Sequence, residues 1–432
     1  MKAKPKKSDQ SNFLYEDLLD QLNPRDPLLG LAERIPWQRF EEEFAGLYSE
    51  QGRPAKPIRL MAGLMILKQL ENLSDERLIE AWVRNPYYQA FCGETHFQWK
   101  FPCDPSDLVY FRKRIGQEGA RLIFEVSVSL HGEKAEESEV TVDTTVQEKN
   151  ITFPTDVKLL TKVIEGCRKI AKDERIGLRR SFRRELPKLL RKPRKSPKIL
   201  KRIRTMAGVL IRELDRKLPK EALARHKDKF QLFRRVHEQK RSDKNKIYSL
   251  HEPEVLCIGK GKEHKKYEFG AKASIVWTKT TGVIVGVKSF DKNIYDGHLL
   301  PEALDQVEEI TGRRPVRAIC DRGFRGQKDA GGTEVLTPGR PKKNDTPYQR
   351  RKIRLCFRRR AGIEPVIGHL KHDYRLARNY LKGVIGDAIN LFMAAAAYNF
   401  KKAMRALGLF FALMALSRSW RAWEPRRLAT AA

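Results

Sequence analysis

The feature that most constrains the fold is an ordered series of strand-like and helical segments inside the chain. Segments rich in β-branched, aromatic and other apolar residues occupy 140–146, 267–279, 282–290, 316–320 and 334–336. This composition favours β-strands. A helical pattern covers 299–310, and a further helix contains Glu364. Apart from a basic segment after the first strand, the order is β-β-β-α-β-(α)-β-α. It predicts an α/β domain with a mixed five-stranded sheet flanked by helices.

The segment that separates the first two strands is strongly basic and also has a helical pattern. Residues 151–250 hold 32 Lys and Arg against 11 Asp and Glu, so this quarter of the chain carries most of the net charge of +33. Apolar residues nevertheless recur at helical spacing, as at Ile203, Met206, Leu210 and Leu214. Prolines mark breaks between the helices. We therefore predict a folded helical insertion with basic outer faces.

The remainder of the chain is expected to be largely helical. Ser74, followed by Asp75 and Glu76, is typical of a helix N-cap with acids in the first turn. A further helix is predicted from Ser106, and it carries Arg112, Lys113 and Arg114. We predict five parts of the chain. They are an N-terminal arm at 1–52, a helical domain at 53–130 that is expected to bind DNA, a catalytic core at 138–158 and 250–380, the basic helical insertion at 159–249, and a C-terminal helix and tail at 381–432.

The charge and composition restrict the kind of partner. A net charge of +33 favours polyanions, and double-stranded DNA is the leading candidate. No basic amphipathic helix with a broad apolar face is recognisable at either end, and the apolar block 407–416 is too short to span a bilayer, so no membrane is expected. The six cysteines lack metal-site spacing and are expected to be reduced thiols. These features predict a cytoplasmic, nucleoid-associated protein.

Three carboxylates are the candidate catalytic residues. Asp143 lies inside a predicted strand, where Asp is disfavoured, and Asp321 follows the apolar strand VRAIC. Glu364 shares one helical stripe with Arg360 and Lys371, because successive helical residues turn by ~100°. If the two strands are neighbours and the helix packs across them, the three carboxylates converge. Oxygen ligands suit Mg²⁺ or Mn²⁺, and two such ions ~3.5–4 Å apart support phosphodiester chemistry.

Each of these residues also has a structural interpretation. A strand-end Asp commonly caps a turn, and a Glu among arginines commonly forms a surface salt bridge. Asp156 is an alternative to Asp143, although it follows Pro154 in an apparent turn. His298, His369, His372 and Trp277 are weaker candidates, for which capping, surface or core positions are preferred. The predicted contacts to the DNA backbone are Arg322, Arg325, Arg358, Arg360 and Lys371.

The predicted helix that contains Glu364 carries a more specific sequence pattern. Phe357, Arg360, Glu364 and Lys371 match the signature Tyr/Phe-x2-Arg-x3-Glu-x6-Lys of bacterial insertion-sequence DDE transposases. The segments VDTT and CDRGFRG look like those that hold the first two aspartates of that family. Over nearly its whole length the chain resembles the insertion-sequence five family.

The resemblance implies an RNase H-like catalytic core in which Asp143, Asp321 and Glu364 bind two divalent metal ions. It also implies cutting at the terminal inverted repeats of a mobile element and joining of the freed 3′ ends to target DNA. Pairing of two element ends suggests a homodimer or higher oligomer in the DNA complex. The alternatives are a catalytically inactive or domesticated DNA-binding protein of the same fold, or an RNase H-like nuclease.

Overall fold

The computed structural model describes residues 17–49, 51–52, 54–191, 197–240, 242–259, 265–339 and 345–429, with side chains up to residue 410. The chain divides into two compact units. The first comprises residues 1–147 and 272–432, and the second comprises residues 148–271.

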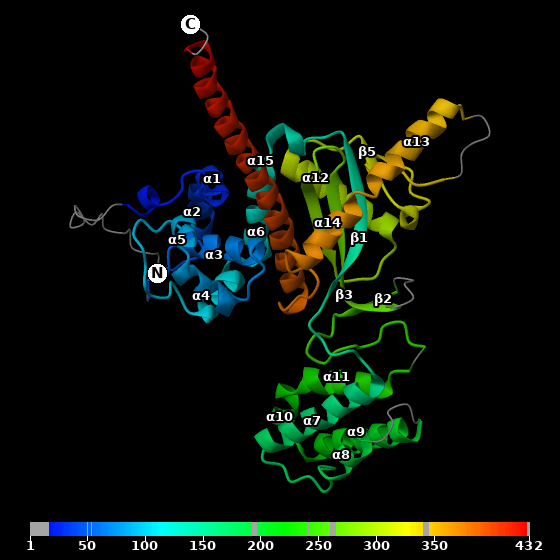
Figure 1. The fold of residues 1–432 in the computed structure, drawn as a ribbon. Coiled ribbons are helices and arrows are strands. Elements are labelled where there is room, and N and C mark those ends of the chain that lie inside the picture. Colours follow the sequence, from blue (N-terminus) through cyan, green and yellow to red (C-terminus); the bar gives the residue numbers. More distant parts are fainter. Residues whose placement is uncertain are drawn as a thin grey trace. The chain divides into compact units, whose positions relative to one another are not determined.

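The strands form one mixed sheet (Figure 1). They are β1 (Glu139–Glu148), β2 (Leu256–Gly259), β3 (Tyr267–Thr278), β4 (Ile284–Phe290), β5 (Arg317–Ile319) and β6 (Glu334–Leu336). The order is β2-β3-β1-β5-β6, with β4 also paired to β3. β3 is antiparallel to β2 and β4, whereas β5 is parallel to β1 and β6. The mixed sheet is confirmed, with one strand more than the five predicted. The additional strand is β2, which pairs only with the first four residues of β3.

Helices cover the sheet and build the rest of the first unit. They are α1 (Pro27–Arg34), α2 (Trp37–Ala45), α3 (Ile58–Leu70), α4 (Asp75–Arg84), α5 (Pro86–Phe91), α6 (Pro105–Ser129), α12 (Asp296–Thr311), α13 (Pro347–Arg360), α14 (Ile363–His372) and α15 (Gly383–Ala429). α15 packs against α1, α3, α6 and β4, and α12 packs against β4 and α6 (Figure 1). One continuous hydrophobic core therefore extends from the N-terminal helices to the sheet.

The segment that we expected to be an N-terminal arm contributes to this core. α1 and α2 lie within it, and Leu31, Phe40 and Phe44 are buried. Phe40 and Phe44 are four residues apart and therefore lie on the same face of α2. The acidic residues between them obscure this face in the sequence. Ser74 caps α4 as predicted, since its side chain accepts a hydrogen bond from the backbone N–H of Arg77 at 3.2 Å.

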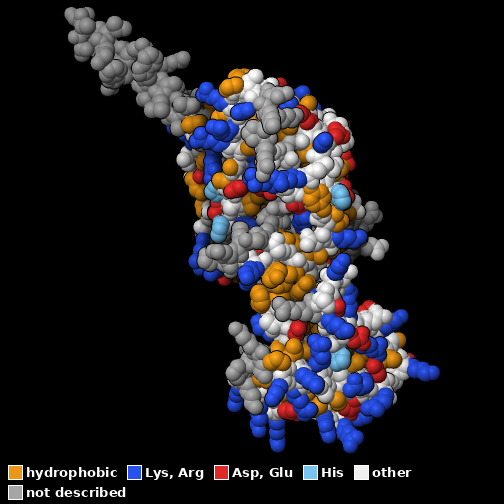
Figure 2. Space-filling view, turned by 90° about the vertical axis from the view of Figure 1, so that its right-hand side faces the viewer, with side chains coloured by type: hydrophobic (Ala, Val, Ile, Leu, Met, Phe, Trp, Pro, Cys, Tyr) orange, Lys and Arg blue, Asp and Glu red, His pale blue; other side chains and the backbone are white. Residues whose placement is uncertain are grey.

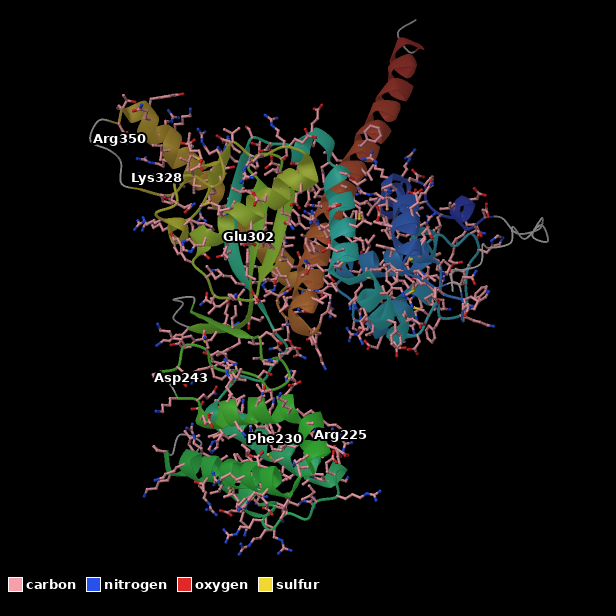
Figure 3. All side chains as sticks on the ribbon, turned by 180° about the vertical axis from the view of Figure 1, so that it is seen from behind. Arg225, Phe230, Asp243, Glu302, Lys328 and Arg350 are labelled. Atoms are coloured by element: carbon pink, nitrogen blue, oxygen red, sulfur yellow. The ribbon has the colours of Figure 1, made fainter. Side chains whose placement is uncertain are left out.

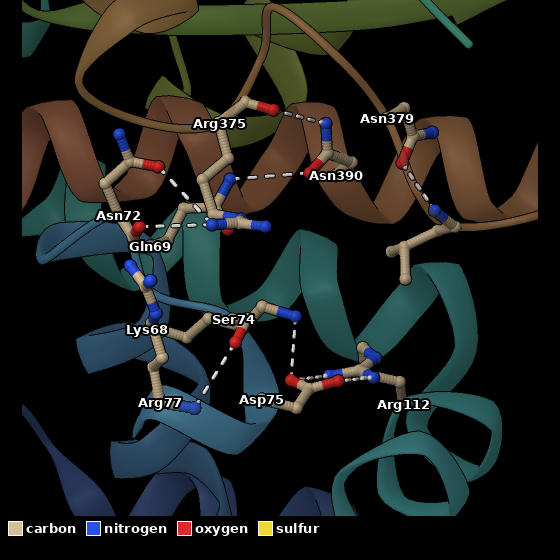
Figure 4. Close-up of polar contacts among 11 residues, drawn as sticks. Lys68, Gln69, Asn72, Ser74, Asp75, Arg77, Arg112, Arg375, Asn379 and Asn390 are labelled. Atoms are coloured by element: carbon tan, nitrogen blue, oxygen red, sulfur yellow. Dashed lines mark hydrogen bonds and ion pairs between the residues drawn. The ribbon is translucent and has the colours of Figure 1, made fainter. Parts of the chain in front are cut away.

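A half-buried ion-pair cluster joins α3, α4 and α6 (Figure 4). Both Nη atoms of Arg112 donate to the Asp75 carboxylate, at 2.9 and 2.6 Å, and Lys68 Nζ donates to it at 2.7 Å. Burial, with the Arg112 charge as the next cause, lowers the pKa of Lys68 to about 8. Arg112 is thus a buried partner of Asp75 and is not part of a DNA-facing basic surface on α6.

The same region is joined to the segment that follows α14. Gln69 Nε2 donates to the carbonyl oxygen of Tyr374 at 2.7 Å, and Asn72 Nδ2 donates to that of His372 at 2.9 Å. Arg375 Nη1 donates back to the carbonyl oxygen of Asn72 at 3.1 Å (Figure 4). These bonds connect the N-terminal helices to the chain between α14 and α15.

The second unit contains the basic insertion, which is helical as predicted. Its helices are α7 (Asp156–Asp173), α8 (Glu185–Leu190), α9 (Pro197–Lys217), α10 (Lys220–Arg225) and α11 (Lys227–Glu238). A separate core includes Val163, Leu210 and Phe230, whereas the side chain of Arg225 is 67% exposed (Figure 3). Figure 2 shows many Lys and Arg side chains on one face of this second unit.

The apolar block 407–416 lies within α15. Among the helices of the described residues, none is long and apolar enough to span a membrane.

Candidate active site

Asp143 and Asp321 lie at the same end of two adjacent strands of the sheet. In the parallel pairing of β1 and β5, Thr141 is opposite Ile319, the last residue of β5. Asp143 and Asp321 each follow two residues later, so both lie just beyond the carboxyl end of this pairing. Local hydrogen bonds orient both carboxylates. The backbone N–H of Thr144 donates to Asp143 Oδ1 at 2.7 Å, and that of Gly323 donates to Asp321 Oδ1 at 2.8 Å.

Glu364 approaches from a helix that is interrupted immediately before it. We predicted one helix through Arg360 and Glu364, but α13 ends at Arg360 and α14 begins at Ile363. The Gly362 N–H bonds to the Arg359 carbonyl oxygen at 3.0 Å, three residues back, so this turn is tighter than an α-helix. A Cβ on Gly362 would lie 3.2 Å from the ring of Trp277, so glycine allows close packing on β3 here.

Arg360 links two of the carboxylates. Its Nη1 lies 3.5 Å from Asp143 Oδ2, and its Nη2 lies 3.3 Å from Glu364 Oε1. The Arg360 side chain is 15% exposed, whereas that of Glu364 is 64% exposed. One guanidinium group therefore brings together a strand carboxylate and a helix carboxylate that are 221 residues apart in the sequence.

A fourth carboxylate, Asp296, borders the site and was missed in the sequence. A Cβ on Gly323 would lie 2.9 Å from Asp321 Oδ1 and 3.0 Å from Asp296 Oδ2, so the two carboxylates flank this glycine. Asp296 begins α12 and forms an ion pair with Lys272 of β3. In the sequence, Asp296 has the features of an ordinary acid in the first turn of a helix. The candidate that we named in this segment was His298, two residues away.

The donor set fits a hard divalent cation in its chemistry. Asp143, Asp321 and Glu364 offer only carboxylate oxygens, which are the ligands that Mg²⁺ and Mn²⁺ favour. Burial is the main cause that raises the pKa of the Cys320 thiol, and the charges of Asp321 and Asp143 add to it. Among the described residues, no group of three or more His, Cys, Asp or Glu side chains is positioned to hold an ion. In this arrangement the guanidinium of Arg360 contacts two of the three carboxylates.

The predicted backbone contacts differ in position. Arg322 and Arg325 are exposed around the 3₁₀ helix η4 (Arg322–Phe324), and Arg358 is exposed in the last turn of α13. Lys371 is half-buried in the last turn of α14. Like Arg360, these residues lie in the same sequence segments as Asp321 and Glu364.

The weaker candidates occupy the positions that we preferred for them. Trp277 packs against the core, and His298 is exposed beside the ring of Tyr295. His369 Nδ1 lies 2.7 Å from Asp373 Oδ2, on the surface of α14. Asp156 is the first residue of α7, in the second unit, and is not in a strand.

Comparison with known proteins identifies the kind of chain. Residues 16–114 match a transposase domain (DUF772), and residues 233–400 match the transposase DDE domain. The second match contains Asp321 and Glu364, whereas Asp143 lies outside both.

A relative from Rhizobium meliloti, described as uncharacterized protein ORF8 in nfe locus, is 45% identical over 183 residues, which is 41% of this chain and 88% of the relative. No solved structure matches. The DDE domain confirms the RNase H-like fold that the family resemblance implied, and the mixed sheet agrees with it. Taken with the geometry of the sheet, these matches show that the chain belongs to the DDE-type insertion-sequence transposases.

Proposed function

We propose that this transposase belongs to the insertion-sequence five family, cuts DNA at the terminal inverted repeats of its element, and joins the 3′ ends to target DNA. The observation that supports the proposal is that Asp143 and Asp321 follow paired residues of two parallel strands, while Arg360 lies within ion-pair distance of both Asp143 and Glu364. These residues come from segments far apart in the sequence. A purely structural role for any one of them does not require that arrangement.

The chain's residues divide the chemical work. Asp143, Asp321 and Glu364 would hold two Mg²⁺ or Mn²⁺ ions, which when bound activate the attacking oxygen and stabilise the leaving oxygen of a phosphodiester. Arg322, Arg325, Arg358 and Lys371 would hold the DNA backbone, a role suited to Arg and Lys because most backbone contacts go to phosphates. Arg360 would leave the carboxylates when the ions bind and turn to the DNA.

The test is cleavage of a duplex that carries the element's terminal repeats. Asp143→Asn, Asp321→Asn and Glu364→Gln should each abolish nicking in Mg²⁺ or Mn²⁺. Each substitution removes the negative charge of a proposed metal ligand and leaves the shape of the side chain nearly unchanged. DNA binding measured without metal should persist. Asp156→Asn is the matched control and should cut normally. Normal cutting by any of the three site variants would refute the catalytic assignment.

We further propose that the DNA complex contains a homodimer or a higher oligomer, since two element ends must be held together. Light scattering of the protein bound to two terminal repeats should give a mass of at least two chains. A complex of one chain with one repeat throughout the reaction would contradict this.

A further inference from the structure

A cavity lies in the first unit, between α14, α15, the 3₁₀ helix η3 (Gly132–Ala135) and the β3–β4 turn. It has a volume of about 450 Å³. Pockets of this size are within the range that holds small ligands. Its lining is mixed, since cationic, aromatic and aliphatic side chains all contribute to it.

The cationic groups are concentrated without a carboxylate among the lining residues. Lys134, Lys402 and Arg405 line the cavity, as do the imidazoles of His131 and His369. Burial is the main cause that lowers the pKa of Lys402, and the charges of Lys134 and Arg405 add to it. Two carboxylates lie beside the lining residues. Asp373 pairs with His369 on the surface of α14, and Glu137 accepts hydrogen bonds from the backbone N–H groups of Thr280 and Thr281. Like charges gathered in this way are stabilised by a bound anion.

The other lining residues suit an organic group. The rings of Tyr374 and Tyr398 meet edge to face with centroids 6.2 Å apart, and Ala406 and Leu409 also line the cavity. A free inorganic anion would leave these side chains unused. A nucleotide combines an anionic phosphate with an apolar sugar and base, and aromatic side chains are common contacts of single-stranded nucleic acid.

We propose that this cavity, the α14–α15 pocket, binds one phosphodiester of a DNA strand with its nucleoside directed to the tyrosines. That the strand is DNA rests on the proposed function. Glu364 and His369 are five residues apart on α14, which corresponds to about 7.5 Å along the helix axis. A strand held beside His369 would therefore lie close to the turn that carries Glu364. The pocket would then fix the position of the strand that is cut.

The experiment measures binding and not cleavage. A labelled single-stranded oligonucleotide and a labelled duplex are titrated without metal at several salt concentrations. Lys134→Gln, Arg405→Gln and Lys402→Gln should each weaken binding of the single strand several-fold, and each should reduce the salt slope by about one. Lys288→Gln is the matched control, since Lys288 is 39% exposed and pairs with Glu302. It removes the same charge outside the pocket and should change little.

Each outcome decides one question. Pocket variants that bind like the Lys288→Gln control, with unchanged melting temperatures, would overturn the pocket but not the proposed function. A wild-type protein that binds no DNA would overturn the proposed function itself. Inorganic phosphate is the second probe. If at equal ionic strength it displaces the strand as well as unlabelled oligonucleotide does, the pocket is a small-anion site and the strand proposal fails.

Discussion

At the scale of single residues, Arg360 contacts two of the three carboxylates of the candidate site. Its guanidinium lies within ion-pair distance of Asp143 and Glu364. Under the proposed function a metal ion would bind these same carboxylates. Arg360 would therefore compete with the ion for them.

We predict that Arg360→Gln binds Mn²⁺ more tightly while cutting DNA more slowly. Partly exposed ion pairs contribute ~0–1 kcal/mol each, so loss of the two pairs should tighten Mn²⁺ binding by at most about thirtyfold. Calorimetric titration without DNA measures the affinity. Arg358→Gln, on the exposed side of α13, should leave the Mn²⁺ affinity unchanged. Weaker Mn²⁺ binding by Arg360→Gln would show that Arg360 supports the ligands and does not compete with ions.

The sequence was informative about the residue types of the site but not about their contacts. An Asp inside VTVDTTV and an Asp after VRAIC are unusual enough to be noticed. Their position at the same end of two adjacent strands depends on the parallel register of β1 and β5, which local composition does not encode. Asp296 could not be recognised, because its place beside Asp321 depends on a close approach at Gly323.

At the scale of elements, the turn after β5 controls the geometry of Asp321. Asp321 caps η4 by accepting a hydrogen bond from Gly323, and Gly323 also faces Asp296. We predict that Gly323→Ala strongly reduces cleavage with little loss of stability. Its added Cβ would stand 2.9 Å from Asp321 Oδ1 and force that carboxylate to move. A nicking assay and a thermal melt measure the two effects.

The control for this prediction is Gly339→Ala, where an added Cβ would meet nothing within 4 Å. It should cut and melt like the wild type. If Gly323→Ala also cuts normally, the position of the Asp321 carboxylate is not critical, and its proposed role as a metal ligand is weakened accordingly.

Strong local patterns made some elements predictable and left others obscure. β3 and β4 were found because apolar runs flank Thr281-Gly282, and Gly282 takes the positive φ of 72° that this turn requires. β2 has only four residues and was missed. The break between α13 and α14 was also missed. Ala361 and Gly362 stay in the right-handed helical region, so the break needs no residue type that would mark a helix end in the sequence.

At the scale of the whole molecule, the chain has two compact units with separate hydrophobic cores. Phe124 is fully buried in the first core and Phe230 is 1% exposed in the second. Units that share no core need not unfold in one transition, which is a common departure from two-state behaviour. Calorimetry of the full chain should therefore show two transitions.

We predict that Phe230→Ala lowers the temperature of one transition and Phe124→Ala that of the other. Replacing a buried Phe by Ala costs ~3–5 kcal/mol, through lost burial and the cavity that remains. The two substitutions are chemically identical, so each is the control for the other. If both lower the same transition equally, the two units unfold together as one cooperative structure. If each acts on its own transition, the insertion can unfold while the unit that holds Asp143, Asp321 and Glu364 stays folded.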